Sequence, residues 1–244
     1  MPDPDDRPAF YASRAERWGD WWTVLHPPYT AWHLSYVVIG AALAPHVDTI
    51  RLLATVLAFF AAVGVAAHAL DELHGHPLRT QIPDSALVAA TVIGLGVAVG
   101  LGIAGISRVG PALIPFIVIG PFLVLAYNLE LFGGRLHTDI AFAISWGAFP
   151  VLTGYVAQAA SIGAAAVLAA AAAVGLSLAQ RSLSTPARTL RRRVNRVDGT
   201  VTLNDGAVRA LNDRMLLEPL EHALQALSWA TVAFAFALVA ARFF

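Results

Sequence analysis

Seven long apolar segments follow one another along this chain, and they constrain its fold more than any other feature. A membrane-spanning helix needs about 20 mostly apolar residues. We predict seven such helices, at residues 27–44, 52–70, 86–106, 110–129, 140–159, 160–180 and 223–241. The third and the last contain no charged side chain. The sequence therefore predicts an all-α, polytopic membrane protein built as a helical bundle.

The composition agrees with this prediction and excludes several other classes. Of 244 residues, 57% are hydrophobic and 13% are charged, whereas soluble domains are about 45–50% apolar and about 25% charged. The net charge is zero, so the basic excess that nucleic-acid binding requires is lacking. Without cysteine or lysine, the chain forms no disulfide, thiolate metal site or lysine Schiff base. The expected partner is the lipid bilayer, and assembly into a homo-oligomer is left open.

The arginines predict an orientation. If the N-terminus is cytoplasmic, thirteen of the 16 arginines lie on the inner side, and only Arg51, Arg108 and Arg242 lie outside. Cytoplasmic loops carry an excess of arginine and lysine. We therefore expect a cytoplasmic N-terminus and an external C-terminus, in the cell membrane of a bacterium or an archaeon.

Four regions divide the predicted chain. Residues 1–26 mix tryptophans with charged residues, which is typical of an amphipathic segment in the membrane interface. Residues 27–180 form a six-helix bundle. Residues 181–217 form a hydrophilic cytoplasmic insertion, in which turn signals flank a short strand at 200–203. Residues 218–244 form the last helix, with Pro219 in its first turn, where proline is tolerated.

Ionisable residues inside membrane segments are costly and often functional. His68, Glu72 and His76 are spaced by four, as are Glu218 and His222, so each set shares one face of a continuous helix. In the predicted topology these helix ends lie on the cytoplasmic side. We expect His68, Glu72, Glu218 and His222 to meet there in one cavity. The full set of predicted metal ligands is His33, His68, Glu72, His76, Glu130, His137, Glu218 and His222.

Imidazole and carboxylate ligands without sulfur favour iron, manganese or zinc. A hydrogen-bonded polar cluster and haem ligation are the alternatives to such a metal centre. We interpret His26, His46 and His74 as ordinary residues of helix ends.

The order of segments resembles the UbiA superfamily of intramembrane prenyltransferases. The segment from His26 to Ala44, which ends Gly-Ala-Ala-Leu-Ala, is similar to the first helix of that family. His68, Glu72 and His76 stand where the first Asp-rich motif would lie, and 78–84 looks like the loop after it. Residues 127–154 resemble the region of the fourth and fifth helices. Ala187-Arg188-Thr189-Leu190 looks like the sequence after the second Asp-rich motif.

The resemblance implies a UbiA-like bundle in which carboxylates bind magnesium and magnesium binds a prenyl diphosphate. The chain departs from that pattern at both motifs. Histidines flank Glu72 in the first, and residues 180–188 contain no carboxylate. Magnesium prefers oxygen ligands, so these departures favour a transition metal. The chain also has fewer predicted spans than is usual in the family.

Three functions follow from these observations. We favour a membrane metalloenzyme, such as a non-haem iron oxidoreductase, acting on an isoprenoid, quinone or lipid. In a hydrolytic version with zinc or manganese, Glu72 or Glu221 serves as the base that activates bound water. The second is a magnesium-dependent prenyltransferase in which Asp71 and Glu72 hold the metal. There, the diphosphate is held by Arg79, Arg188 and the arginine run that begins at Arg191. The third is a non-enzymatic metal or haem carrier, or a membrane assembly factor.

Overall fold

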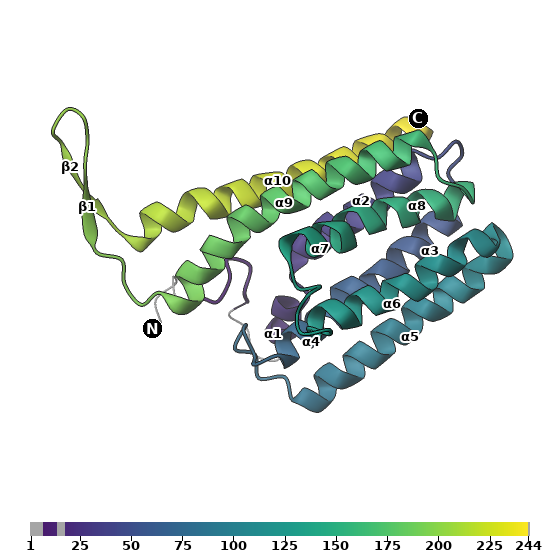
Figure 1. Ribbon diagram of the computed structural model, residues 1–244, viewed down its shortest axis with the longest axis horizontal. Helices are drawn as coiled ribbons and strands as arrows, with labels where there is room; N and C mark the ends of the chain where they lie inside the picture. The colour runs from purple at the N-terminus through teal and green to yellow at the C-terminus, as the bar shows by residue number, and fades with distance from the viewer. Residues whose placement is uncertain (1–6, 14–17, 244) are drawn as a thin grey trace.

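The computed structural model describes residues 7–13 and 18–243. It confirms an all-α helical bundle, to which one small β-hairpin is attached. The helices run back and forth between two ends of the molecule, which lie to the left and to the right in Figure 1. We call the end at which α4 and α9 finish the polar end, and the other the opposite end.

The chain crosses the bundle in alternating directions. It begins with the short α1 (Trp18–Val24) and with α2 (Pro27–Ala42), which leads to the opposite end. The return path is α3 (Thr49–Phe59), the π-helical η1 (Phe60–Ala67) and α4 (His68–Leu73). The remaining elements are α5 (Asp84–Val109), η2 (Pro111–Leu113), α6 (Ile114–Asn128), α7 (Asp139–Ala143), η3 (Ile144–Ala148), α8 (Phe149–Ala159), α9 (Ala164–Arg193) and α10 (Asp213–Phe243).

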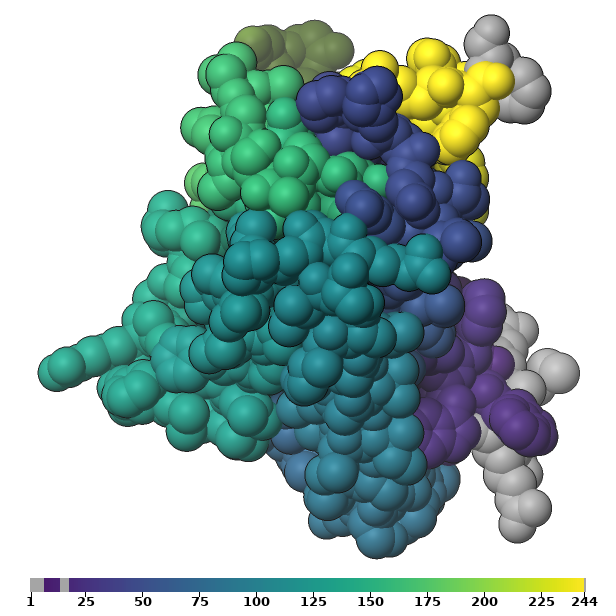
Figure 2. All heavy atoms as spheres, turned by 90° about the vertical axis from the view of Figure 1, so that its right-hand side faces the viewer, coloured from purple at the N-terminus to yellow at the C-terminus, as the bar shows by residue number. Residues whose placement is uncertain are grey.

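Three layers make up the bundle. The long helices α9 and α10 lie side by side on one face, α2 and α8 lie in the middle, and α3, α5 and α6 lie on the other face (Figure 1). Figure 2 looks onto the opposite end, where the α2–α3 loop, the α5–α6 turn and the end of α10 come together. The polar end faces away from the viewer in that figure.

Six helical segments in the described part of the chain are long and apolar enough to cross a membrane. They begin at Thr49, Asp84, Pro111, Asp139, Ala164 and Asp213. The first predicted span is the shorter α2 of 16 residues, about 24 Å at 1.5 Å per residue, and it is largely buried between its neighbours. The molecule is thus suited to an integral, multi-pass membrane protein.

Large apolar side chains cover the outside of the bundle. Val92, Val118, Leu168 and Phe236 are each more than 60% exposed. A soluble monomer rarely carries so continuous an apolar surface, whereas lipid chains solvate it. The outer faces of the helices therefore agree with the membrane environment that the composition predicts.

Glycines bring α2 and α8 into backbone contact at the centre of the bundle. A Cβ atom on Gly40 would lie 2.0 Å from the carbonyl oxygen of Val151, and one on Gly154 would lie 2.1 Å from that of Val37. Close helix approach through small residues is typical of membrane bundles, because dispersion forces there replace the hydrophobic effect. Around this contact, Trp32, Tyr36 and Val37 are almost completely buried.

The hydrophilic insertion differs in part from its prediction. A strand is confirmed there: β1 (Gly199–Thr202) pairs in antiparallel fashion with β2 (Val208–Leu211). The start at residue 181 is wrong, because α9 remains helical to Arg193 despite Pro186. The last helix begins at Asp213, so Pro219 lies inside it rather than in its first turn.

Candidate functional site

A polar cavity of about 490 Å³ opens at the polar end of the bundle. This volume is within the range of small-molecule sites, about 300–1,000 Å³. The N-terminal segment, α2, α4, α6, α9 and α10 all contribute to its wall. Its charged or hydrogen-bonding residues include Tyr11, His26, Tyr29, His33, His68, Asp71, His74, Tyr127, Asn128, Glu130, His137, Arg181, Arg188, Arg191, Arg192, Arg193 and Glu221.

The arginines come from the end of α9. Residues 181, 188 and 192 are seven and four apart, so they share one face of that helix. Arg181 donates to Asp139 at 2.8 Å and lies over the ring of Phe142. Nε of Arg192 donates to the carbonyl oxygen of Pro8 at 3.3 Å. Extension of α9 beyond residue 181, which the sequence did not predict, thus places these guanidinium groups in the cavity.

Arg188 and Asp71 are opposite charges of the cavity, and the side chain of neither has a hydrogen-bond partner among the described residues. Both side chains line the cavity, and both residues remain accessible. By contrast, Arg191 is bound to Glu221 through two nitrogen–oxygen contacts, one of 2.8 Å. The cavity therefore offers a guanidinium and a carboxylate that are free to bind a ligand.

The N-terminal segment forms one wall of the cavity. Residues 8–11 line it, and the hydroxyl of Tyr11 lies 2.7 Å from Nδ1 of His26. Burial raises the pKa of Tyr11 well above its ordinary value, so the phenol stays protonated. Of the predicted amphipathic segment, residues 7–13 form a turn and Trp18–Val24 form a short helix; residues 1–6 and 14–17 of that prediction lie outside the described residues.

A pair of stacked histidines faces the same space. The rings of His26 and His68 are parallel within 14°, and their centroids are 4.4 Å apart. Burial, followed by the nearby His68 and Arg192, lowers the pKa of His26 well below its ordinary value. Nε2 of His26 is buried and has no hydrogen-bond partner among the described residues. His26 and His74 stand at helix ends as predicted, at the start of α2 and the end of α4, and both also line the cavity; His46 is exposed at the opposite end.

Three other predicted ligands also line the cavity. Nδ1 of His33 donates to the carbonyl oxygen of Trp146 at 3.0 Å. The ring of His137 stacks on Tyr127, and its Nδ1 lies 3.9 Å from a carboxylate oxygen of Glu130. These side chains come from α2 and from the turn between α6 and α7. The prediction that separate helix ends deliver polar groups to one side is therefore confirmed for His33, His68, Glu130 and His137.

Glu72 and His76 lie outside the cavity, although they contact each other: Nδ1 of His76 lies 3.4 Å from a carboxylate oxygen of Glu72. The helix ends at Leu73, and His76 has a left-handed backbone with φ of 49°. Glu72 is completely buried and accepts hydrogen bonds from the backbone N–H groups of Leu78 and Thr80 and from the Thr80 hydroxyl. Its carboxylate closes the loop after α4. Glu72 is thus occupied by that loop and does not face the cavity as a base or ligand.

Besides Glu72, His76 also contacts Asp84. Its Nε2 lies 3.0 Å from Oδ1 of Asp84 at the start of α5, and this hydrogen bond raises the pKa of His76. Arg79, the predicted diphosphate ligand in the same loop, is exposed and does not line the cavity.

Glu218 and His222 also fail to reach the cavity. Glu218 pairs with Arg214 at 2.8 Å on the exposed side of α10, and His222 is exposed. The buried face of α10 instead runs through Glu221, Leu224 and Ser228. The prediction that His68, Glu72, Glu218 and His222 meet in one cavity is therefore wrong.

Tyr11 and Tyr29 line the cavity but were not predicted as site residues, whereas Arg192 belongs to the arginine run that was. The end of α9 had been placed too early, so the spacing that sets Arg192 on the same helix face as Arg181 and Arg188 was not used. Nothing in the sequence pairs Tyr11 with His26, because their contact joins an irregular segment to the start of α2.

Within residues 7–13 and 18–243, no three His, Asp or Glu side chains lie close enough together to hold a metal ion. The parallel rings of His26 and His68 give one reason. A metal lies in the plane of each imidazole that binds it, and two parallel, stacked planes cannot both contain one ion. No protein-family model, curated protein or solved structure matches the chain.

Proposed function

We propose that this protein is a membrane-embedded, prenyltransferase-like enzyme whose polar cavity binds the phosphate or diphosphate group of an isoprenoid or related lipid. The observation that carries this proposal is the convergence of five arginines on one cavity between apolar helices. Three carboxylates share that lining, and Glu221 among them is already neutralised by Arg191. The balance of charge therefore favours an anionic ligand.

Arg188 is the principal anion-binding residue in this proposal, because its guanidinium has no hydrogen-bond partner among the described residues. Arg192 lies one turn further along α9 and donates to a single backbone carbonyl. Guanidinium groups bind phosphate oxygens through charge-assisted hydrogen bonds. The two residues would hold the anionic group and stabilise negative charge that develops on it.

The remaining wall suits a hydrocarbon chain. Val63, Ala67, Phe142 and Trp146 line the same cavity as the arginines. An amphiphile can thus bind with its charged group at α9 and its apolar part against η1 and η3. The apolar side chains also exclude water from the bond that is broken.

Asp71 is the residue that would hold magnesium. Magnesium is commonly bound by one or two carboxylates together with substrate phosphates, and Asp71 offers an accessible carboxylate beside the arginines. Bound magnesium would neutralise part of the diphosphate charge. Glu130 is the other accessible carboxylate of the lining, whereas Glu72 does not fit this role because the loop after α4 engages both of its oxygens.

Binding to the protein in lipid nanodiscs tests the proposal. We expect farnesyl diphosphate to bind more tightly than either farnesol or inorganic diphosphate, because each of these lacks one half of the amphiphile. Arg188→Gln should weaken binding by about 10-fold or more, since a hydrogen bond to a charged group contributes about 1.5–3 kcal/mol. Arg214→Gln is the matched control, because that arginine is exposed on α10.

Two results would contradict the proposal: farnesyl diphosphate that fails to bind, or binding that Arg188→Gln leaves unchanged. The role of Asp71 is tested separately. Magnesium should strengthen binding to the wild type and not to Asp71→Asn.

A transition-metal enzyme has less support from the geometry, because Glu72, His76, Glu218 and His222 are directed elsewhere. It stays a prediction that elemental analysis of the purified protein tests. Retained iron, manganese or zinc that is lost in His68→Ala would favour it over the prenyltransferase.

A further inference from the structure

A second cavity, of about 290 Å³, lies between α3, α5, α6 and α8. Its lining is almost entirely apolar, and small side chains such as Ala54, Ala58 and Gly102 leave the space open. It contacts the polar cavity only through the shared wall residues Val63 and Trp146. It is thus a distinct site, and it has no role in the function proposed above.

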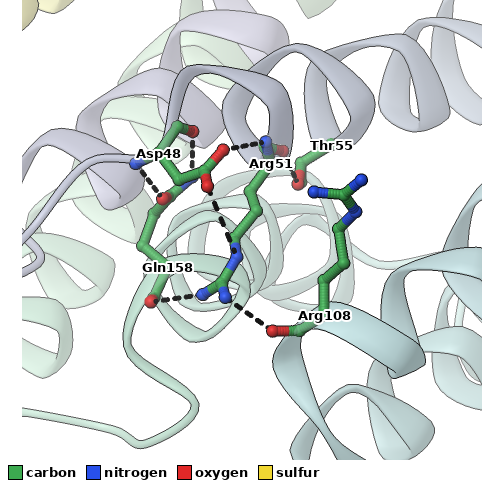
Figure 3. A network of polar contacts seen from close by, with 5 residues as sticks. All are labelled: Asp48, Arg51, Thr55, Arg108 and Gln158. Atoms are coloured by element: carbon green, nitrogen blue, oxygen red, sulfur yellow. Dashed lines mark hydrogen bonds and ion pairs between the residues drawn. The ribbon is translucent and has the colours of Figure 1, made fainter.

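Two arginines stand at the mouth of this cavity. Arg51 lies in the first turn of α3 and Arg108 in the last turn of α5, so both lie at the opposite end of the bundle. Figure 3 shows that Arg51 is held in place: its guanidinium donates to the carbonyl oxygens of Gln158 and Arg108 and lies 4.0 Å from Asp48. Arg51 therefore fixes the ends of α3, α5 and α8 relative to one another.

Arg108 is free to bind a ligand. Its carbonyl oxygen accepts from Arg51, but no described residue hydrogen-bonds to its guanidinium, which extends beside Arg51 in Figure 3. Asp48 is the carboxylate of this network, and the hydrogen bond that it accepts from the Arg51 backbone lowers its pKa. One ionised carboxylate thus faces two guanidinium groups, which leaves an excess positive charge at the mouth.

The depth of the cavity matches one leaflet of a bilayer. Its lining on the α3–η1 path extends from Arg51 to Val63, about 18 Å at 1.5 Å per residue. Half of a hydrocarbon core of about 30 Å is about 15 Å. A chain that starts at the level of the arginines would therefore end near the middle of the membrane.

We propose that this cavity binds one acyl chain of an anionic glycerophospholipid, whose phosphate contacts Arg108 and Arg51. The apolar lining selects the chain, and the excess positive charge selects the anionic headgroup. Such a lipid would fill the space that the small side chains leave between α3 and α5.

Native mass spectrometry of the delipidated protein tests this site. We expect phosphatidylglycerol to bind more tightly than phosphatidylcholine with the same acyl chains, and inorganic phosphate not to bind at the same concentration. Arg108→Gln should weaken phosphatidylglycerol binding by about fivefold, the factor that corresponds to the roughly 1 kcal/mol of one arginine near an anionic lipid. Arg214→Gln, at the polar end, should leave it unchanged.

A second variant tests the apolar part. Ala58→Leu inserts three carbon atoms into the cavity and should weaken phosphatidylglycerol binding while Arg108 remains in place. The proposal is overturned if the two lipids bind equally, if inorganic phosphate competes fully with phosphatidylglycerol, or if Arg108→Gln binds like the wild type. Arg108 makes no described side-chain hydrogen bond, so Arg108→Gln should fold normally. Its farnesyl diphosphate binding should be unchanged, which separates this test from that of the polar cavity.

Discussion

The side chains of Arg191 and Glu221 form a two-point ion pair that joins the end of α9 to α10 at the wall of the polar cavity. Both side chains are nearly buried, with 7% and 11% of their surface exposed. The guanidinium contacts both carboxylate oxygens of Glu221, so neither oxygen is free to contact a substrate. Glu221 therefore acts in the structure as a link between helices rather than as the base that the sequence analysis considered.

Removing one partner of this ion pair should destabilise the protein strongly. Removing one partner of a buried ion pair leaves an uncompensated charge and costs about 3–5 kcal/mol. We expect Glu221→Ala to lower the free energy of unfolding in detergent by about that amount. Glu218→Ala is the control on the same helix, since exposed pairs contribute about 0–1 kcal/mol and Glu218 pairs with Arg214 at the surface. Equal losses in the two variants would show that the buried pair has no special role.

Glu72 and Asp71 should behave differently although they are adjacent. Glu72 accepts three hydrogen bonds from the loop after α4, and a buried donor without a partner costs about 1–3 kcal/mol. We expect Glu72→Ala to unfold at a clearly lower temperature and to expose the 74–80 loop to proteolysis. Asp71→Ala should keep the stability of the wild type, because its carboxylate faces the cavity. A stable Glu72→Ala protein that has lost a bound metal would restore Glu72 as a metal ligand.

The sequence predicted the helices well because membrane helices are specified by local composition. It also predicted that polar groups gather at one end, since charges in a membrane protein lie near the helix ends. It did not predict which of them share a cavity. His76 was assigned to the face of His68 because their spacing assumes a continuous helix, but the helix stops at Leu73.

The same limit applies to α10 and to the N-terminus. Glu218 and His222 have helical spacing, but the packing of α10 against α9 and α2 buries Glu221 instead. His26 precedes α2, and in the cavity it contacts Tyr11 and His68, which are distant from it in sequence. Such contacts depend on how helices pack, and single-sequence periodicity does not contain that information.

The contact between α2 and α8 should tolerate no side chain at Gly40. A Cβ atom there would lie 2.0 Å from the carbonyl oxygen of Val151, so the helices would have to separate. Overpacking usually costs about 1–3 kcal/mol, and we expect Gly40→Ala to lose at least that much in unfolding free energy. Gly100→Ala is the control, because nothing lies within 4 Å of its Cβ position in α5. It should be neutral or stabilising by up to about 1 kcal/mol. A stable Gly40→Ala protein would contradict the close contact.

Acidification should destabilise the protein through His26. Burial lowers the pKa of His26 well below 6.5 in the folded state, whereas the unfolded chain binds a proton near pH 6.5. Above that pH, neither state is protonated and His26 has no effect on stability. As the pH falls below 6.5, the unfolded state binds more protons, so the free energy of unfolding decreases.

Because other groups titrate as well, the measurement compares unfolding of the wild type and of His26→Gln between about pH 7.5 and 5. We expect a smaller loss for His26→Gln, whereas His46→Gln, changed at an exposed position, should follow the wild type. Parallel curves for the wild type and His26→Gln would show that His26 accepts a proton as readily in the cavity as in the unfolded chain.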